Sequence, residues 1–247
     1  MDRNRWPVVL VALAGFAVGC AKAGSSSPWE SSPDSATPGD DDGGASDDSA
    51  SPTGDDGGAG AETAAPGVAL PFYVSDEFIP AGFMGDSTAS MNAITVGHDV
   101  TACKLPRQSG VGGDCYKVTW APSLPDGGAA WAGVYWQSPA NNWGAHPGKA
   151  ITAGATKVSF YAAGAVGGET LQLCSGGINT NAASATLPYG DTFSVKQPAI
   201  TLTTDWTQYE LSLAGTSYTD VLGAFCWVAS TNSTESITFY IDDLKWE

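Results

Sequence analysis

Positive charge is scarce in this chain of 247 residues, where 10 lysines and arginines stand against 26 aspartates and glutamates and the formal net charge is −16. In the part that begins at Val68, 15 acidic residues against 7 basic ones leave a net charge of −8. Such a surface would repel nucleic-acid phosphates and anionic lipid headgroups. We therefore expect no nucleic-acid partner and no direct adsorption to a membrane.

Histidine and catalytic motifs are scarce as well. His98 and His146 are the two histidines, and the sequence contains no Gly-x-Ser-x-Gly, His-Glu-x-x-His or phosphate-binding glycine motif. It also lacks the Cys-x-x-Cys spacing that is typical of structural zinc sites. These absences favour a protein that is not an enzyme. A glycosidase needs only two carboxylates, however, so Glu169 and Glu210 are kept as possible acids of a hydrolase or lyase.

The apolar run near the N-terminus is too short to cross a membrane. It covers the twelve residues from Val8 to Gly19, whereas a membrane-spanning helix needs about 20 residues. Arg3 and Arg5 precede this run. A positive flank followed by a short apolar core is the pattern of a signal peptide, which we place at residues 1–19.

The end of this segment, Ala17-Val18-Gly19-Cys20, resembles the lipobox of bacterial lipoproteins. The resemblance implies that Cys20 is diacylated and becomes the new N-terminus. It also implies, because Ala21 rather than an aspartate follows, export to the outer membrane of a Gram-negative bacterium. The alternative is an ordinary cleaved signal peptide.

The cysteine count fits an exported protein. Four cysteines remain after Cys20, an even number that suits disulfides in an oxidising compartment. Cys103 and Cys115 flank a glycine-rich segment, which favours a local bridge. Cys174 and Cys226 lie in separate strand-like segments, so a bridge between them would join neighbouring strands. Three pairings of the four are possible.

The segment from Cys20 to residue 67 is predicted to be a disordered tether. It is rich in Gly, Ser, Pro and Asp and carries ten acidic residues, with almost no large apolar side chains to offset the entropy of ordering. Asp-rich runs at residues 39–44 and 54–58 repeat loosely, but they lack the alternating ligands and final Glu of an EF-hand loop. We expect an extended, self-repelling acidic spacer.

Residues 68–247 show the pattern of short β-strands. Segments of alternating apolar and polar residues are separated by Gly, Pro, Asn and Asp, and none shows sustained helical periodicity. In residues 206–213, for example, Tyr209, Leu211 and Leu213 should face inward. About ten such segments predict one all-β domain, a two-sheet antiparallel β-sandwich with jelly-roll topology.

The last strand-like segment carries an irregularity. Three apolar residues share one face and two later ones have the opposite parity: Ile237, Phe239 and Ile241, then Leu244 and Trp246. A β-bulge near Asp242 and Asp243 would resolve the conflict.

The ending from Phe239 to Leu244 resembles the closing strand of galactose-binding-like jelly rolls, which occur in many carbohydrate-binding modules. In that family the first and last strands lie close together and often share a structural calcium ion. The resemblance implies Asp76, Glu77 and Asp242 as candidate Ca²⁺ ligands, since calcium is bound by several oxygen atoms at flexible geometry. Surface acids at a sheet edge are the alternative.

The densest feature is an aromatic segment in which three tryptophans and a tyrosine fall within residues 131–143. Strand periodicity places Trp131, Tyr135 and Gln137 on one face, and Val134 and Trp136 on the other. Sugar recognition uses flat apolar rings for stacking and planar amides for hydroxyl groups. The candidate ligand-binding residues are therefore Trp131, Tyr135, Gln137, Asn141, Asn142 and Trp143. Core packing of the rings and turn formation by the asparagines are the alternative.

These observations support one leading hypothesis and two alternatives. The leading hypothesis is a monomeric, non-catalytic carbohydrate-binding domain on a lipid anchor at the cell envelope, with oligo- or polysaccharide as partner. The first alternative is a structural or protein-interaction lipoprotein with the same sandwich and no sugar site. The second is a hydrolase or lyase.

Overall fold

The computed structural model describes residues 67–98, 112–124, 128–180 and 184–247. The expected signal peptide, Cys20 and almost all of the expected tether lie outside the described residues, as does Cys103. No helix among those that the structure describes is long and apolar enough to span a membrane.

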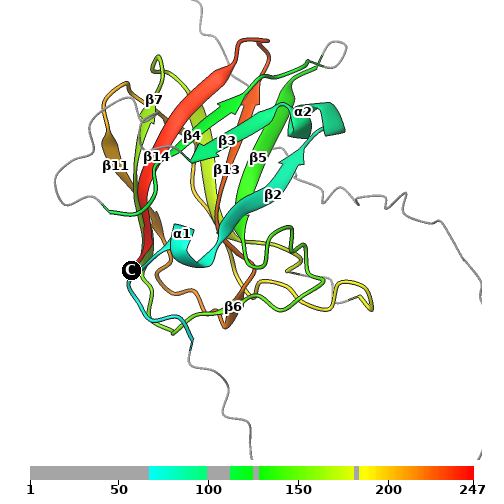
Figure 1. The fold of residues 1–247 in the computed structure, drawn as a ribbon, viewed down its shortest axis with the longest axis vertical. Coiled ribbons are helices and arrows are strands. Elements are labelled where there is room, and N and C mark those ends of the chain that lie inside the picture. Colours follow the sequence, from blue (N-terminus) through cyan, green and yellow to red (C-terminus); the bar gives the residue numbers. More distant parts are fainter. Residues whose placement is uncertain (1–66, 99–111, 125–127, 181–183) are drawn as a thin grey trace, which may run out of the picture. The chain divides into compact units, whose positions relative to one another are not determined.

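The domain is a sandwich of two antiparallel six-stranded sheets, shown in Figure 1. The first sheet consists of β11 (Thr207–Ser212), β7 (Lys157–Gly164), β14 (Ile237–Trp246), β4 (Tyr116–Trp120) and β3 (Ile94–His98), with β1 (Phe72–Tyr73) also paired to β14. The second sheet consists of β10 (Ile200–Thr201), β8 (Thr170–Gly176), β13 (Gly223–Thr231), β5 (Ala130–Gln137) and β2 (Ile79–Gly85), with β9 (Ser194–Lys196) also paired to β8. The predicted all-β, two-sheet jelly roll is confirmed.

Short elements complete the domain. A separate two-stranded sheet joins β12 (Asp220–Val221) to β6 (Lys149–Ala150). Two short helices, α1 (Val74–Glu77) and α2 (Thr88–Asn92), flank β2. The side chain of Ser87 caps α2 by accepting a hydrogen bond from the Ser90 backbone N–H at 3.1 Å.

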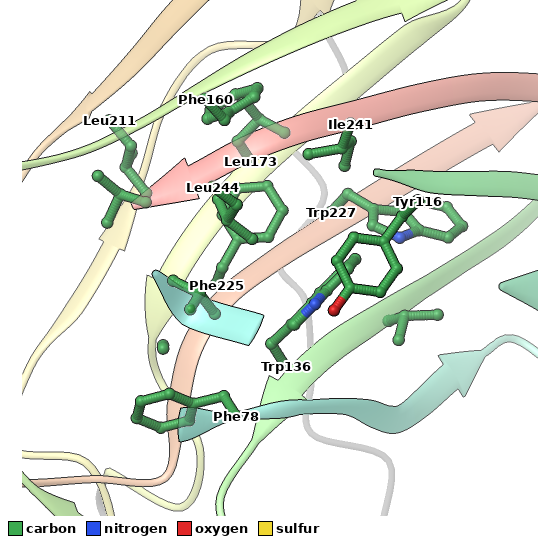
Figure 2. Close-up of a cluster of buried hydrophobic side chains, with 14 of the residues drawn as sticks. Phe78, Tyr116, Trp136, Phe160, Leu173, Leu211, Phe225, Trp227, Ile241 and Leu244 are labelled. Carbon is green, nitrogen blue, oxygen red and sulfur yellow. The ribbon is translucent and has the colours of Figure 1, made fainter. Parts of the chain in front are cut away.

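The core lies between the sheets and is built from large aromatic side chains (Figure 2). Four tryptophans are fully buried there: Trp120, Trp136, Trp227 and Trp246. Leu211 and Leu213 are buried, and Tyr209 stacks on Phe160, so the predicted inward face of β11 is confirmed. Each fully buried side chain of this size contributes on the order of 2–3 kcal/mol by leaving water, which makes this interior the main source of stability.

The irregularity predicted in the last strand is present in β14. The register between β14 and β7 shifts between Asp242 and Lys245, and Asp243 has a φ of 53°. The extra residue changes which alternate positions of β14 face the core. Ile241 faces the core before the bulge, and Leu244 and Trp246 face it after the bulge.

A disulfide joins Cys174 on β8 to Cys226 on β13, with the two Cα atoms 4.9 Å apart. The two residues are directly opposite each other in the antiparallel register. The expected bridge between neighbouring strands is therefore confirmed. Cys115 is also disulfide-bonded, while its expected partner Cys103 lies outside the described residues.

Candidate functional site

The strand β5 presents two different faces, as its sequence predicts. Val134 and Trp136 point into the core between the sheets. The residues of opposite parity, among them Trp131, Tyr135 and Gln137, therefore belong to the outer face of the second sheet. This outer face is where the candidate ligand-binding residues gather, but the structure separates them into exposed and buried members.

Gln137 is one of the buried members, which corrects its assignment as a surface contact. Its side chain is 0% exposed, and neither atom of its amide has a hydrogen-bond partner. The amide lies across Gly82 of the neighbouring strand β2, because a Cβ built on that glycine would be 2.6 Å from the Gln137 Cδ. A position that is covered in this way cannot contact a glycan directly.

Asn142 is the second correction. Its side chain is 1% exposed, and its polar atoms are hydrogen-bonded to the backbone of the loop that follows β5. The carboxamide oxygen accepts hydrogen bonds from the backbone N–H groups of Gly144 and His146, at 3.1 and 3.2 Å. The amide nitrogen donates to the carbonyls of Ser138 and His146, at 3.1 and 2.9 Å. Asn142 therefore fixes the shape of the loop, in keeping with the tendency of asparagine to build turns.

Tyr135 is mostly buried and serves as a support. Its hydroxyl donates a hydrogen bond to the Gly176 carbonyl at 3.1 Å. Its ring packs edge-on against Trp143, with ring centroids 6.1 Å apart. Together with Cys174 and Cys226, Tyr135 belongs to a small hydrophobic cluster on the outer side of the sheet.

Trp143 is an exposed aromatic residue, as its loop position predicts, with 38% of its surface accessible. Tyr189, in the loop that follows β8, is 42% exposed. The two loops are joined next to these rings, because the Tyr189 backbone N–H donates to the Gly144 carbonyl at 3.0 Å. Asn141 beside Trp143 is exposed in a left-handed turn conformation with a φ of 59°. We call Trp143 and Tyr189 the loop aromatic pair.

Trp131 lies at the other end of β5 and is half-buried. Tyr135 lies four positions further along the strand, which corresponds to a rise of about 13 Å. Gly133 lies between them, flanked by Met84 of β2 and Val228 of β13. The outer face thus carries Trp131 and Tyr135 towards the two ends of β5, with the side chains of Met84 and Val228 over the backbone between them.

The polar neighbours of this face come from adjacent strands. Ser230 is paired with Trp131, and Gln172 is paired with Val228. Directly paired residues of antiparallel strands share a face of the sheet. Lys196, paired with Cys174, adds an exposed amine on the same side. The outer face therefore combines aromatic rings with amide, hydroxyl and ammonium groups.

A buried carboxylate that the sequence analysis did not identify lies behind the loop aromatic pair. Asp191 is 2% exposed, and its two oxygens accept hydrogen bonds from the backbone N–H groups of Ile178 and Leu222, at 2.9 and 2.7 Å. Burial raises the pKa of Asp191 from 3.8 to about 6, against the opposing effect of these hydrogen bonds. Both Asp191 and Tyr189 stand alone in a polar loop sequence, which carries no motif that would have indicated their roles.

The three candidate calcium ligands do not form a shared cluster. The Glu77 carboxylate is paired with the Lys149 ammonium at 2.7 Å, Asp76 is exposed, and Asp242 is buried and accepts a hydrogen bond from the Asp243 backbone N–H at 2.8 Å. Across the described part of the chain, no three His, Cys, Asp or Glu side chains form a group that could hold a metal ion. These side chains do not fit a common calcium site, and no chemistry is assigned to calcium.

The two possible catalytic acids lie on different sheets. Glu169 directly precedes β8 in the second sheet, is buried, and accepts a hydrogen bond from the Val166 backbone N–H at 2.9 Å. Glu210 lies on β11 in the first sheet and is paired with Lys157 at 2.6 Å. Glu169 and Glu210 therefore do not form a pair of carboxylates beside Trp143 and Tyr189.

Comparison with known proteins gives likenesses of structure only. Neither a protein-family model nor a curated protein matches the chain. Among solved structures, the chain is similar to a family 30 carbohydrate-binding module, with 14% identity over 72% of this chain and 98% of that one and a TM-score of 0.43. It is also similar to the family 30 module of cellulosomal cellulase Cel9D-Cel44B of Clostridium thermocellum, with 16% identity over 69% and 94% of the two chains and a TM-score of 0.41. The family 11 module of cellulosomal cellulase Lic26A-Cel5E of the same organism matches with 14% identity over 68% and 87% and a TM-score of 0.37. At these identities the likeness concerns the β-sandwich fold alone.

Proposed function

We propose that this domain binds oligo- or polysaccharide without catalysing a reaction, and that a lipidated Cys20 holds it at the cell envelope. The observation that carries the sugar-binding proposal is the loop aromatic pair. Most large aromatic side chains of the domain are buried, whereas Trp143 and Tyr189 keep 38% and 42% of their surfaces accessible on two hydrogen-bonded loops.

Exposed rings of this kind suit a sugar ligand. The face of an indole or phenol stacks on the C–H groups of a pyranose, while the polar edge stays available to water or hydroxyl groups. The loop of Trp143 is held by the internal hydrogen bonds of Asn142, and its ring rests on Tyr135. A ring that is held in place before binding loses little conformational freedom, which favours affinity.

The length of the outer face favours a chain over a single sugar. Trp131 and Tyr135 are separated by about 13 Å along β5, and the Tyr135 ring contacts the exposed Trp143. Ser230 and Gln172 border this track and can pair with hydroxyl groups. The ligand best matched to such a surface is an extended saccharide of several units.

The test is a titration of the purified domain with a panel of soluble glycans, followed by tryptophan fluorescence and calorimetry. We expect saturable binding of at least one glycan, and a loss of about fivefold or more in affinity in each of Trp143→Ala and Tyr189→Ala, since stacking of a sugar on one ring is worth on the order of 1 kcal/mol or more. Phe83→Ala is the matched control, because Phe83 is 37% exposed but lies on β2 and outside the loop aromatic pair. Absence of binding across the panel, or equal losses in all three variants, would contradict the proposal.

The anchor is tested separately. Expression of the full chain in a Gram-negative host should place it in the membrane fraction, and Cys20→Ser should release it into the soluble fraction. Mass spectrometry of the mature N-terminus should find a diacylated Cys20. An unmodified N-terminus at a different residue would support the ordinary cleaved signal peptide instead.

A protein-interaction role is the second candidate, and one observation favours it. Ile79 and Phe83 on β2 are 55% and 37% exposed, and Phe83 lines an open hollow together with Met91, Asn92 and Ile94. Among the described residues, β2 is an edge strand of its sheet. If this edge mediates association with a second copy, sedimentation should show a concentration-dependent dimer that Phe83→Ser abolishes. A monomer at all concentrations would remove self-association as its role.

A further inference from the structure

The two loops that carry the exposed rings are joined from behind by the carboxylate of Asp191. Its Oδ2 accepts from the Ile178 backbone N–H at 2.9 Å, at the start of the loop that bears Tyr189. Its Oδ1 accepts from the Leu222 backbone N–H at 2.7 Å. The Leu222 carbonyl in turn accepts from the Ser138 backbone N–H at 3.0 Å, where the loop of Trp143 begins. The Asp191 side chain therefore ties the Tyr189 loop to Leu222, which directly precedes β13, and the Leu222 backbone ties this point to the start of the Trp143 loop.

The same contacts reach the rings themselves. Ile178 and Leu222 pack in the hydrophobic cluster with Tyr135, whose ring supports Trp143 edge-on. Asp191 lies two residues after Tyr189, and the Asp191 backbone N–H donates to the Ile178 carbonyl at 2.8 Å, which closes the Tyr189 loop at its base. A movement of the Asp191 carboxylate would therefore be transmitted to both exposed aromatic residues.

The surroundings of this carboxylate contain no charge that offsets its own. The groups that act on it are the backbone N–H groups of Ile178, Leu222 and Gly223, and no charged side chain of the described residues shifts its pKa. Lys196, five residues after Asp191, and Asp220, two residues before Leu222, are both exposed to solvent. Burial therefore makes ionisation of the Asp191 carboxyl unfavourable, because the charged form loses its hydration.

We propose that Asp191 is a positioning residue for Trp143 and Tyr189, and that it makes the closure of the two loops stronger in mild acid than at neutral pH. This inference deepens the proposed function and rests on it only for the effect on glycan affinity. The closure itself is a property of the loops without ligand.

The direction follows from proton linkage. With the loops closed, burial raises the pKa of Asp191 to about 6, whereas an opened, solvated carboxyl would return towards 3.8. The closed form therefore binds the proton more tightly than the open form, so protonation favours closure. The advantage is complete below a pH of about 4 and is lost as the pH rises through about 6. A difference of about two pKa units corresponds to about a hundredfold change in the opening equilibrium.

The experiment is amide hydrogen exchange of the ligand-free protein from pH 4 to 8, with rates corrected for the intrinsic pH dependence of exchange. We expect the protection of the Ile178 and Leu222 amides to fall by about a hundredfold between pH 4 and 7 in the wild type. Asp191→Asn should abolish this pH dependence, and Asp220→Asn, which changes an exposed carboxyl of the neighbouring strand, should preserve it. Because the wild-type profile needs no variant, the measurement stands even if Asp191→Asn folds poorly.

Glycan titrations over the same pH range separate this inference from the proposed function. Affinity that rises as the pH falls, together with rising protection, supports both. Rising protection without glycan binding at any pH supports the loop closure and rejects the sugar-binding proposal. Protection of Ile178 and Leu222 that is flat between pH 4 and 7, or that falls in acid, overturns the role of Asp191 whether or not a glycan binds.

Discussion

Removal of the disulfide between Cys174 and Cys226 should destabilise the domain by about 4 kcal/mol. The cross-link closes a loop of 52 residues in the unfolded chain. In the chain-entropy description, a loop of this length removes about 14 cal/mol/K of entropy from the unfolded state, or about 4 kcal/mol at 25 °C. For a domain of this size, the loss corresponds to a decrease of roughly 8–16 °C in the melting temperature.

Two double variants separate the cross-link from packing. Cys174→Ala with Cys226→Ala removes the bond and also leaves space beside Tyr135 in the outer hydrophobic cluster. Cys174→Val with Cys226→Val removes the bond but largely refills that space. Urea unfolding followed by tryptophan fluorescence gives the free energy of unfolding of each. We expect both to lose about 4 kcal/mol, with the alanine pair losing about 1–2 kcal/mol more. A valine pair within about 1 kcal/mol of the wild type would refute the entropic account for this bond.

Three further changes test other parts of the structure. The buried Asp191 should make the free energy of unfolding fall by up to about 3 kcal/mol as the pH rises from about 4 to above 6, since the folded protein binds the proton more tightly than the unfolded chain. Asp191→Asn should flatten this dependence in urea titrations. A difference in stability between wild type and Asp191→Asn that instead favours the wild type as the pH rises over that range would contradict the prediction. Asn142→Ala should cost about 2–3 kcal/mol, because several backbone groups of the loop that follows β5 lose their partner, whereas Asn141→Gly on the exposed neighbouring position should stay within about 0.5 kcal/mol in the same assay. Because Asp76, Glu77 and Asp242 do not form a common calcium site, chelation should leave the melting temperature of the domain unchanged, and a decrease would show that these side chains do hold a structural ion.

The fold could be predicted largely from periodicity. The alternation in residues 206–213 predicted that Leu211 and Leu213 face inward, and the alternation in β5 separated Trp136 from Trp131 and Tyr135, because strand geometry alone dictates which residues share a face. The change of parity between Ile241 and Leu244 predicted the bulge of β14 for the same reason. These inferences needed no knowledge of which strands are neighbours.

The candidate site was predicted only in part, because exposure depends on segments that are far apart in the sequence. Trp131, Tyr135 and Gln137 do share a face, but the sequence does not show that the Gln137 amide is covered while Trp131 stays half-exposed. In the sequence, Asn142 cannot be distinguished from an asparagine whose amide binds a ligand. Only its hydrogen bonds to the loop backbone reveal a structural role. Tyr189 is joined to Gly144, the residue after Trp143, by one backbone hydrogen bond across 45 positions of sequence, which no local pattern encodes.

The pairing of β1 with β14 has a practical consequence for engineering this domain. Phe72 lies opposite Trp246 in the register, so the start of the folded region and its last strand run side by side. A short flexible connector from Glu247 to the residues before Phe72 could therefore close the polypeptide into a ring, and new ends could be opened in an exposed turn elsewhere. A passenger protein fused directly before Phe72 or directly after Glu247 would leave the sandwich from the same end of this strand pair.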